Sequence, residues 1–357
     1  MNPLPDFPWD LLAPYAEKAR AHPDGIVDLS VGTPVDPTPH LVQQALAAAA
    51  DAPGYPLTAG TDRLRETIVG WLDRRFGATV PVDGVLPVIG TKELVAWLPT
   101  LLGAERVGFP ALAYPTYDVG ARLAGATGVA VDATVSLGPG RVDLLWLNSP
   151  SNPTGKVLPP AHLRKVVDWG RERGTVIASD ECYADLYYGA EPPASVLSPD
   201  VCGGSLDGLL AVHSLSKRSN LAGYRAGFIA GDPVLVGRLL EVRKHAGMIV
   251  PAPVQAAMVA ALLDDAHAVE QRARYAARRN ALLAAVSGAG FVVDESEAGL
   301  YLWATRDEPC WETVDRLAAL GILVAPGEFY GVAGARHVRI ALTATDERIA
   351  AACTRLA

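Results

Sequence analysis

A lysine with serines before it and an arginine after it is the group in this sequence best suited to covalent chemistry. Lys217 follows a short apolar run, Ser214 and Ser216 precede it, and Arg225 stands before a second apolar run. A neutral lysine amine can form an imine with an aldehyde. Hydroxyl groups and a guanidinium suit a phosphate. The pattern predicts a ligand with both groups, pyridoxal phosphate; the alternative is a surface lysine in a polar turn.

Two loops offer hydrogen-bond donors at the ends of predicted strands. Gly90, followed by Thr91 and Lys92, joins a predicted strand to a predicted helix, where backbone N–H groups can face an anion. Asn152 lies in a loop with two prolines that follows another predicted strand, and its amide could donate to a phenolate-like oxygen. In each case the alternative is a tight turn that binds nothing.

Asp180 and Arg339 are charged residues in otherwise apolar strands. A carboxylate at the end of a buried strand is costly unless it is paired, and a protonated ring nitrogen would be such a partner. Tyr183 lies three residues further on and could reach a neighbouring ring oxygen. The guanidinium of Arg339 matches a carboxylate in a bidentate manner. The alternatives are a helix N-cap for Asp180 and a structural ion pair for Arg339.

Apolar runs that alternate with helical patterns predict the elements that position these residues. Strands that are apolar on both faces and separated by helices indicate a mostly parallel sheet covered on both sides. Ligands of such sheets bind at the carboxyl ends of the strands, where the candidate residues of this region fall. The expected strands are 85–89, 106–109, 129–131, 144–147, 175–178, 209–213 and 226–230. The expected helices are 40–50, 62–76, 92–102 and 160–173.

The character of the sequence changes after about residue 245 and indicates a second, smaller domain. Two long helical patterns are followed by strands that alternate with helices, which is an α+β pattern. These elements are helices 251–263, 266–285, 311–320 and 346–356, and strands 291–293, 301–304 and 338–341. We therefore predict an α/β fold with a large domain at 41–244. A smaller domain at 245–357 would be joined by a proline-rich N-terminal arm at 1–40.

Composition excludes several other classes of protein. The 357 residues are 50% hydrophobic and carry a net charge of −8, which gives no sign of a nucleic-acid-binding surface. The four cysteines form no C-x-x-C pattern, so we expect free thiols and no metal site. The sequence starts without a signal-peptide pattern, and no apolar run reaches the roughly 18 residues that span a bilayer. We expect a cytoplasmic protein that binds small molecules.

At these residues the whole chain resembles the class I/II aminotransferases, which are fold-type I enzymes that use pyridoxal phosphate. The motifs are Ser214-Leu215-Ser216-Lys217, Asn152-Pro153-Thr154-Gly155, Asp180-Glu181-Cys182-Tyr183 and Ala113-Tyr114-Pro115. The resemblance implies that Lys217 is the Schiff-base lysine. It also implies that Asp180 pairs with the pyridine nitrogen, and that Asn152 and Tyr183 bind the ring hydroxyl.

The resemblance also implies how the cofactor phosphate is held. Ser214, Ser216 and Arg225 would bind it together with the turn at Gly90 and Thr91.

The remaining implied contacts concern the ring, the neighbouring subunit and the substrate. Tyr114 would stack on the ring. Tyr55 would reach the phosphate of the neighbouring subunit, which implies a homodimer. Arg339 would hold the substrate α-carboxylate, and Gly32 would approach the substrate through its backbone.

Within this family, the segments 29–39 and 90–94 look like those of bacterial N-succinyldiaminopimelate aminotransferases of lysine biosynthesis. Those enzymes exchange an amino group between glutamate and N-succinyl-2-amino-6-oxopimelate. Lys92 could serve either the phosphate or a distal carboxylate. An aspartate or broad-range aminotransferase, or a lyase of carbon–sulfur bonds, would share the same central residues. A transcription regulator with a sensor domain of this kind would need a DNA-binding segment, which the sequence does not show.

Overall fold

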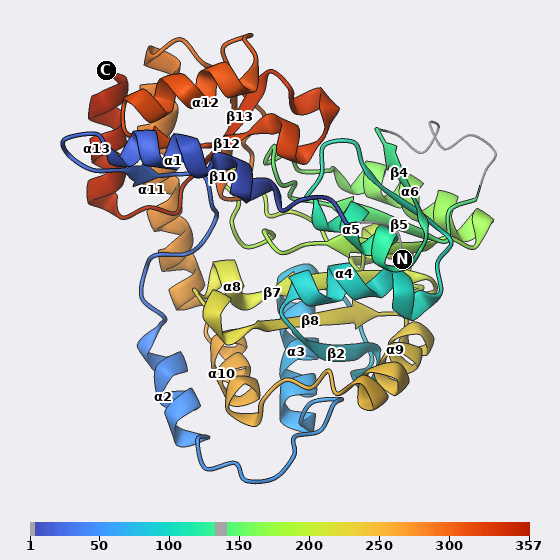
Figure 1. Cartoon of the computed structure of the whole chain (residues 1–357). Coiled ribbons are helices and arrows are strands. Elements are labelled where there is room, and N and C mark those ends of the chain that lie inside the picture. The colour runs from blue at the N-terminus through green and yellow to red at the C-terminus, as the bar shows by residue number, and fades with distance from the viewer. Residues whose placement is uncertain (1–3, 133–140) are drawn as a thin grey trace.

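The computed structural model describes residues 4–132 and 141–357. The first three residues of the predicted arm and residues 133–140 of the predicted large domain lie outside this part. The described chain folds around a seven-stranded sheet and a separate four-stranded sheet, which lies beside the C-terminal helices, and a further pair of strands adds to the smaller part (Figure 1). This arrangement confirms the predicted α/β class with a smaller second domain.

The large sheet has seven strands in the order β2-β8-β7-β6-β5-β3-β4. Its strands are β2 (Val85–Ile89), β3 (Arg106–Pro110), β4 (Thr127–Val131), β5 (Leu144–Asn148), β6 (Val176–Asp180), β7 (Leu209–Ser214) and β8 (Ala226–Gly231). Strands β4, β3, β5, β6 and β7 are parallel, and β8 runs antiparallel to both of its neighbours. Every residue of β5, β7 and β8 is buried, which is typical of strands covered on both faces.

Two groups of helices cover the two faces of this sheet. Helices α3 (Asp62–Phe76), α6 (Pro160–Arg173) and α10 (Ala252–Leu263) contribute to one core. Helices α4 (Thr91–Leu102), α5 (Thr116–Leu123) and α9 (Pro233–Ala246) contribute to the other. The remaining helical segments of the large domain are α2 (His40–Ala48), α7 (Pro199–Cys202), α8 (Leu215–Arg218), η2 (Val82–Gly84) and η4 (Ala222–Tyr224).

The small domain joins the two ends of the chain. Its antiparallel sheet has the order β12-β13-β10-β9, and β1 (Val27–Asp28) pairs in parallel with β11 (Ile322–Leu323). Helix α1 (Ala13–Arg20) packs on α12 (Cys310–Ala319), where blue and red ribbons meet in Figure 1. The other elements are η1 (Pro8–Leu12), β9 (Val292–Asp294), β10 (Tyr301–Thr305), β12 (Ala325–Pro326), β13 (His337–Ala341), η5 (Gly327–Tyr330), η6 (Val332–Gly334), α11 (Ala266–Gly288) and α13 (Asp346–Leu356).

The N-terminal residues are thereby built into the C-terminal sheet. The backbone N–H of Ala341 donates to the Leu29 carbonyl at 2.8 Å, and Arg339 Nη2 donates to the Ser30 carbonyl at 2.8 Å. The prediction of an irregular arm was therefore incomplete, because it missed α1 and β1. Both are short, and they are stabilised by packing against residues far away in the sequence.

The boundary between the domains stays a prediction. We propose that it lies nearer residue 265 than 245, because α10 shares its core with α3. All four cysteines are free thiols. Among the described residues, no helix combines the length and the apolar character needed to cross a membrane.

Candidate active site

A cavity of about 1270 Å³ opens at the carboxyl ends of β5, β6 and β7. The strand register places Asn148 opposite Asp180, and Asp180 opposite Val212, so that these strands end together. The predicted site residues that line the cavity are Gly32, Thr91, Lys92, Tyr114, Asn152, Asp180, Tyr183, Ser214, Ser216, Lys217, Arg225 and Arg339. Gly90 and Tyr55 are the predicted residues that do not line it.

Lys217 lies half-buried in this cavity, in the short helix α8. The Ser214 hydroxyl accepts a hydrogen bond from the backbone N–H of Ser216 at 3.1 Å and so caps this helix. Lys217 Nζ donates to the backbone carbonyl of Gly32. Burial lowers the pKa of Lys217, and the Arg339 and Arg225 cations lower it further. These surroundings favour the neutral amine that covalent chemistry needs, and the surface-lysine alternative does not fit them.

The N-terminus of α4 and Arg225 form an anion site in the same cavity. No side chain caps this helix, and Gly90 precedes it with a φ of 73°. A Cβ atom on Gly90 would lie 2.7 Å from Arg225 Cζ, so only glycine lets the guanidinium approach this turn. Ser214 and Ser216 line the cavity as well. Free backbone N–H groups, hydroxyls and a guanidinium fit a phosphate group.

Asp180 is a buried carboxylate without a cationic partner among the described residues. Its Oδ2 accepts a hydrogen bond from the Tyr117 hydroxyl at 2.9 Å, and its Oδ1 accepts one from the backbone N–H of Cys182 at 3.2 Å. Burial raises the pKa of Asp180. No helix begins at this residue, so the N-cap alternative does not fit. A positively charged ring nitrogen would complete the site.

Arg339 is a buried cation whose partners leave room for an anion. Its Nη1 donates to Asn152 Oδ1 at 3.0 Å, and its Nε has no hydrogen-bond partner among the described residues. The rings of Tyr301 and Tyr330 lie 3.8 and 4.8 Å from its Cζ. No carboxylate of the described residues pairs with it, and the groups that act on its charge are tyrosines, so the structural ion pair is not observed. The arrangement suits a bidentate carboxylate ligand.

Asn152 is fixed by its two neighbours. Its backbone N–H donates to Asn148 Oδ1 at 2.7 Å, while its own Oδ1 accepts from Arg339. The side-chain NH₂ is then the group left to donate into the cavity.

Comparison with known proteins identifies the family. The family described as "Aminotransferase class I and II" matches residues 24–356. The chain belongs to this family. It is therefore an aminotransferase, and its cofactor is pyridoxal phosphate.

Three curated relatives match nearly the whole of this aminotransferase. It is 63% identical to the 4-dedimethylamino-4-oxo-anhydrotetracycline transaminase of Streptomyces rimosus, over 100% of both chains. It is 67% identical to a probable aminotransferase of Mycobacterium tuberculosis, over 99% of this chain and 85% of the relative. An LL-diaminopimelate aminotransferase of Gloeobacter violaceus is 31% identical over 100% of this chain and 96% of its own.

Solved structures have the same fold. An aminotransferase from Neisseria meningitidis superposes with a TM-score of 0.90 at 30% identity, covering 99% of this chain and 97% of its own. A probable N-succinyldiaminopimelate aminotransferase from Thermus thermophilus superposes with a TM-score of 0.89 at 28% identity, covering 98% and 99%.

Several residues of this aminotransferase site were not anticipated from sequence. Tyr117 donates a hydrogen bond to Asp180 from helix α5, which was not predicted. The sequence does place Tyr117 three residues after Tyr114, a predicted site residue, and this spacing could have indicated it. Tyr301 contacts Arg339 and Tyr183 from β10, and only the small-domain packing brings these residues together. Other unexpected lining residues are Trp9, Cys182, Trp311, Phe329 and Tyr330.

Tyr55 lies outside the cavity of the aminotransferase. Its side chain is fully exposed, at 101% of the reference area, in the connection between α2 and α3. A side chain in this position can contact another subunit, but it does not contact the cavity of its own subunit.

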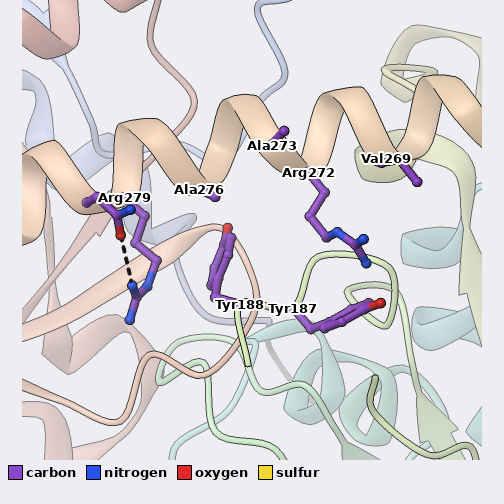
Figure 2. A pocket seen from close by; sticks show the side chains of 8 residues that line it. Tyr187, Tyr188, Val269, Arg272, Ala273, Ala276 and Arg279 are labelled. Carbon is purple, nitrogen blue, oxygen red and sulfur yellow. Dashed lines mark hydrogen bonds between the residues drawn. The ribbon is translucent and has the colours of Figure 1, made fainter. Parts of the chain in front are cut away.

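A second cavity, of about 260 Å³, lies between α11 and the segment after β6 (Figure 2). Arg272 reaches down from α11 over the Tyr187 ring, with Cζ 4.1 Å from its centre. Arg279 Cζ lies 5.0 Å from the centre of the Tyr188 ring, whose hydroxyl donates to the Gly299 carbonyl at 2.6 Å. None of the predicted site residues lines this cavity, so the larger one is the candidate active site.

Proposed function

We propose that this aminotransferase exchanges an amino group between N-succinyl-LL-2,6-diaminopimelate and 2-oxoglutarate, in lysine and diaminopimelate biosynthesis. The proposal is based mainly on two cations, Arg339 and Lys92, that line the same cavity but differ in burial. Arg339 is only 2% exposed, whereas Lys92 is exposed at the opening. Both substrates carry an α-carboxylate and at least one distal carboxylate, and these groups match the two cations.

The volume of the cavity and the names of two similar proteins support the same substrate. A volume of about 1270 Å³ exceeds the roughly 300–1,000 Å³ of typical small-molecule sites and so leaves room for a long substrate beside the cofactor. The names of the Gloeobacter relative and of the Thermus structure both refer to diaminopimelate aminotransfer.

The proposed roles follow from the geometry of the side chains. Pyridoxal phosphate supplies an electron sink when bound. Asp180 would keep the ring nitrogen protonated, and the N-terminus of α4 together with Arg225 would hold the phosphate. Arg339 orients the substrate through its α-carboxylate. Lys217 Nζ then removes a proton from the substrate α-carbon as a general base.

A second candidate is amino transfer to a ketone on a fused-ring substrate. The name of the Streptomyces rimosus relative describes such a reaction. Aromatic residues of this chain gather on one wall of the cavity, with ring centres of Trp9 and Phe329 5.4 Å apart and those of Trp311 and Phe329 5.8 Å apart. This wall would suit a flat apolar ligand. Aspartate or broad-range aminotransfer and carbon–sulfur lysis remain alternatives.

A comparison of donors tests the proposal. We would measure kcat/KM for N-succinyl-LL-2,6-diaminopimelate, LL-diaminopimelate, aspartate and an aromatic amino acid, each with 2-oxoglutarate. The succinylated donor should lead. A clear lead for another donor would overturn the proposed substrate, and product without keto-acid exchange would indicate a lyase. Preferential amination of a fused-ring ketone would favour the second candidate.

Lys92 allows a sharper test of the distal carboxylate. Lys92→Met removes the charge but keeps most of the side-chain length. We expect kcat/KM for the succinylated donor to fall about 10- to 100-fold, because one charge-assisted hydrogen bond contributes about 1–3 kcal/mol. The aromatic amino acid, which has no second carboxylate, should be nearly unaffected. Lys92→Arg is the control that keeps the charge. An equal loss for all donors would assign Lys92 to the phosphate.

Arg339→Lys should weaken every donor alike. An ammonium cannot form the bidentate pair, so we expect kcat/KM to fall about 10- to 100-fold for each donor. Parallel kinetics with aspartate and the succinylated donor check this. A loss confined to one donor would contradict an α-carboxylate role, because both donors carry that group.

We also propose a homodimer in which Tyr55 reaches the phosphate of the partner subunit. Tyr55→Phe alone should weaken cofactor affinity about 10-fold or more, through the loss of a hydrogen bond to a charged group. Mixing it with Lys217→Ala protein under subunit exchange should restore sites that combine both intact residues. The control is mixing with a protein that carries both changes, which should restore nothing. Lack of recovery in the first mixture would show that Tyr55 does not act across subunits.

A further inference from the structure

Tyr301 lies where three of the proposed site residues meet. It begins β10, is only 4% exposed and lines the large cavity. In the β10–β13 pairing it stands opposite Ala341, so Arg339, two residues before Ala341, is its diagonal neighbour on the same face of the sheet. The Arg339 guanidinium carbon lies 3.8 Å from the centre of its ring. The ring thus supports the cation from the side of the sheet.

The hydroxyl of Tyr301 has a different neighbour. It lies 3.3 Å from the Tyr183 hydroxyl, and either oxygen can act as the donor. Burial raises the pKa of Tyr183. Burial would also raise the pKa of Tyr301, but the Arg339 and Lys217 cations hold it below its ordinary value. When the Tyr301 hydroxyl donates in this contact, the Tyr183 proton is free to point into the cavity.

Gly32 leaves the space that this phenol occupies. A Cβ atom on Gly32 would lie 2.7 Å from Tyr301 Cζ and still closer to the hydroxyl oxygen. The carbonyl of the same glycine accepts the hydrogen bond from Lys217 Nζ. The titratable and charged groups close enough to act electrostatically on this phenol are Lys217, Tyr183, Arg339, Tyr114, Tyr330 and Tyr275.

We propose that Tyr301 is a positioning residue with two separable parts. Its ring holds Arg339 in place for the substrate carboxylate, and its hydroxyl polarises Tyr183 toward the cofactor oxygen. The inference rests on the roles proposed above for Arg339 and Tyr183. A desolvated cation–π contact stabilises the guanidinium, and a hydroxyl that accepts a hydrogen bond donates more strongly in turn.

Two substitutions at Tyr301 separate the parts. Tyr301→Phe removes the hydroxyl and keeps the ring, whereas Tyr301→Leu removes both. For Tyr301→Leu we expect KM for every amino donor to rise about 10- to 30-fold, as expected from the loss of a desolvated cation–π contact. The dissociation constant of succinate, a dicarboxylate that cannot react, should rise by the same factor. For Tyr301→Phe both quantities should stay within about threefold of wild type.

The hydroxyl is tested by the absorbance of the cofactor-loaded enzyme. Weaker donation from Tyr183 stabilises negative charge on the ring oxygen less well, so the protonated form of the chromophore should persist to higher pH. We expect the midpoint of the visible pH titration to rise by about half a unit to one unit in Tyr301→Phe. Gly32→Ala, which displaces the same hydroxyl, should shift the midpoint in the same direction. An unchanged midpoint in Tyr301→Phe would overturn the role of the hydroxyl.

Arg339→Gln, measured in parallel, separates this inference from the proposed function. If Arg339→Gln leaves KM and succinate binding unchanged, the proposed carboxylate site fails. If Arg339→Gln weakens both and Tyr301→Leu weakens neither, only the role of the ring fails. Thermal melting of each variant controls for folding. Should Tyr301→Leu fail to fold, Tyr301→Met replaces it, because it also removes the ring while filling more of its space.

Discussion

Replacing Lys217 with alanine is expected to abolish amino transfer while the protein remains folded. Lys217 is proposed both to bind the cofactor covalently and to move the proton at the substrate α-carbon. A positioned general base alone contributes about 10²- to 10⁴-fold, so the combined loss in kcat should be at least 10⁴-fold. The variant should also lack the visible absorbance of the lysine-bound cofactor. Near-normal turnover would contradict the assignment.

Lys217→Arg is the matched control for this experiment. Arginine can also donate to the Gly32 carbonyl, but its guanidinium does not lose a proton at any accessible pH. It should therefore be as inactive as alanine. An active arginine variant would mean that Lys217 serves only as a cation. Circular dichroism and thermal melting establish that both variants are folded.

Asp180→Asn should reduce kcat by about 10³-fold or more while pyridoxal phosphate still binds. Asparagine has nearly the same shape and can keep the hydrogen bonds to Tyr117 and Cys182, but it cannot balance a positive ring nitrogen. A 10³-fold loss corresponds to about 4 kcal/mol of transition-state stabilisation, which is reasonable for a buried charge pair. Stopped-flow half-reactions and cofactor binding would be measured together.

The matched control for Asp180 is Tyr117→Phe. It removes one hydrogen bond to the carboxylate and leaves the charge, so about a 10-fold loss is expected. If Asp180→Asn lowers only the melting temperature, the residue has a structural role and the assignment is wrong.

Capping residues and hydrophobic patterns, which act over a few residues, allowed most strands and helices of the large domain to be predicted from sequence. Helix α3 begins and ends at the predicted residues, because the Thr61 hydroxyl accepts from the backbone N–H of Leu64 at 3.2 Å and Gly77 ends the helix with a φ of 61°. The rule that ligands bind at the carboxyl ends of parallel strands led to the prediction of Asp180 and Ser214 as site residues, and both line the large cavity.

Contacts between segments far apart in the sequence could not be predicted from such local patterns. Arg339 meets Asn152 across 187 positions of sequence, and no local pattern encodes that pairing. Helix α9 was missed although Asp232 caps it, with Oδ1 accepting from the backbone N–H of Val234 at 2.8 Å. Tyr301 looked like an ordinary strand residue, since its importance comes from the neighbours that the small domain gives it.

The pairing of β1 with β11 has a consequence for how the chain is made. On a ribosome, Val27 emerges 295 positions before Ile322, the residue it faces, since 322 − 27 = 295. At about 5–20 residues per second, that interval is roughly 15–60 s. During this time the lysine-bearing sheet can form, but Leu29 and Ser30 have no strand to bind. Arg339, which the carboxylate site needs, is therefore made only after the residues at the ends of β5, β6 and β7.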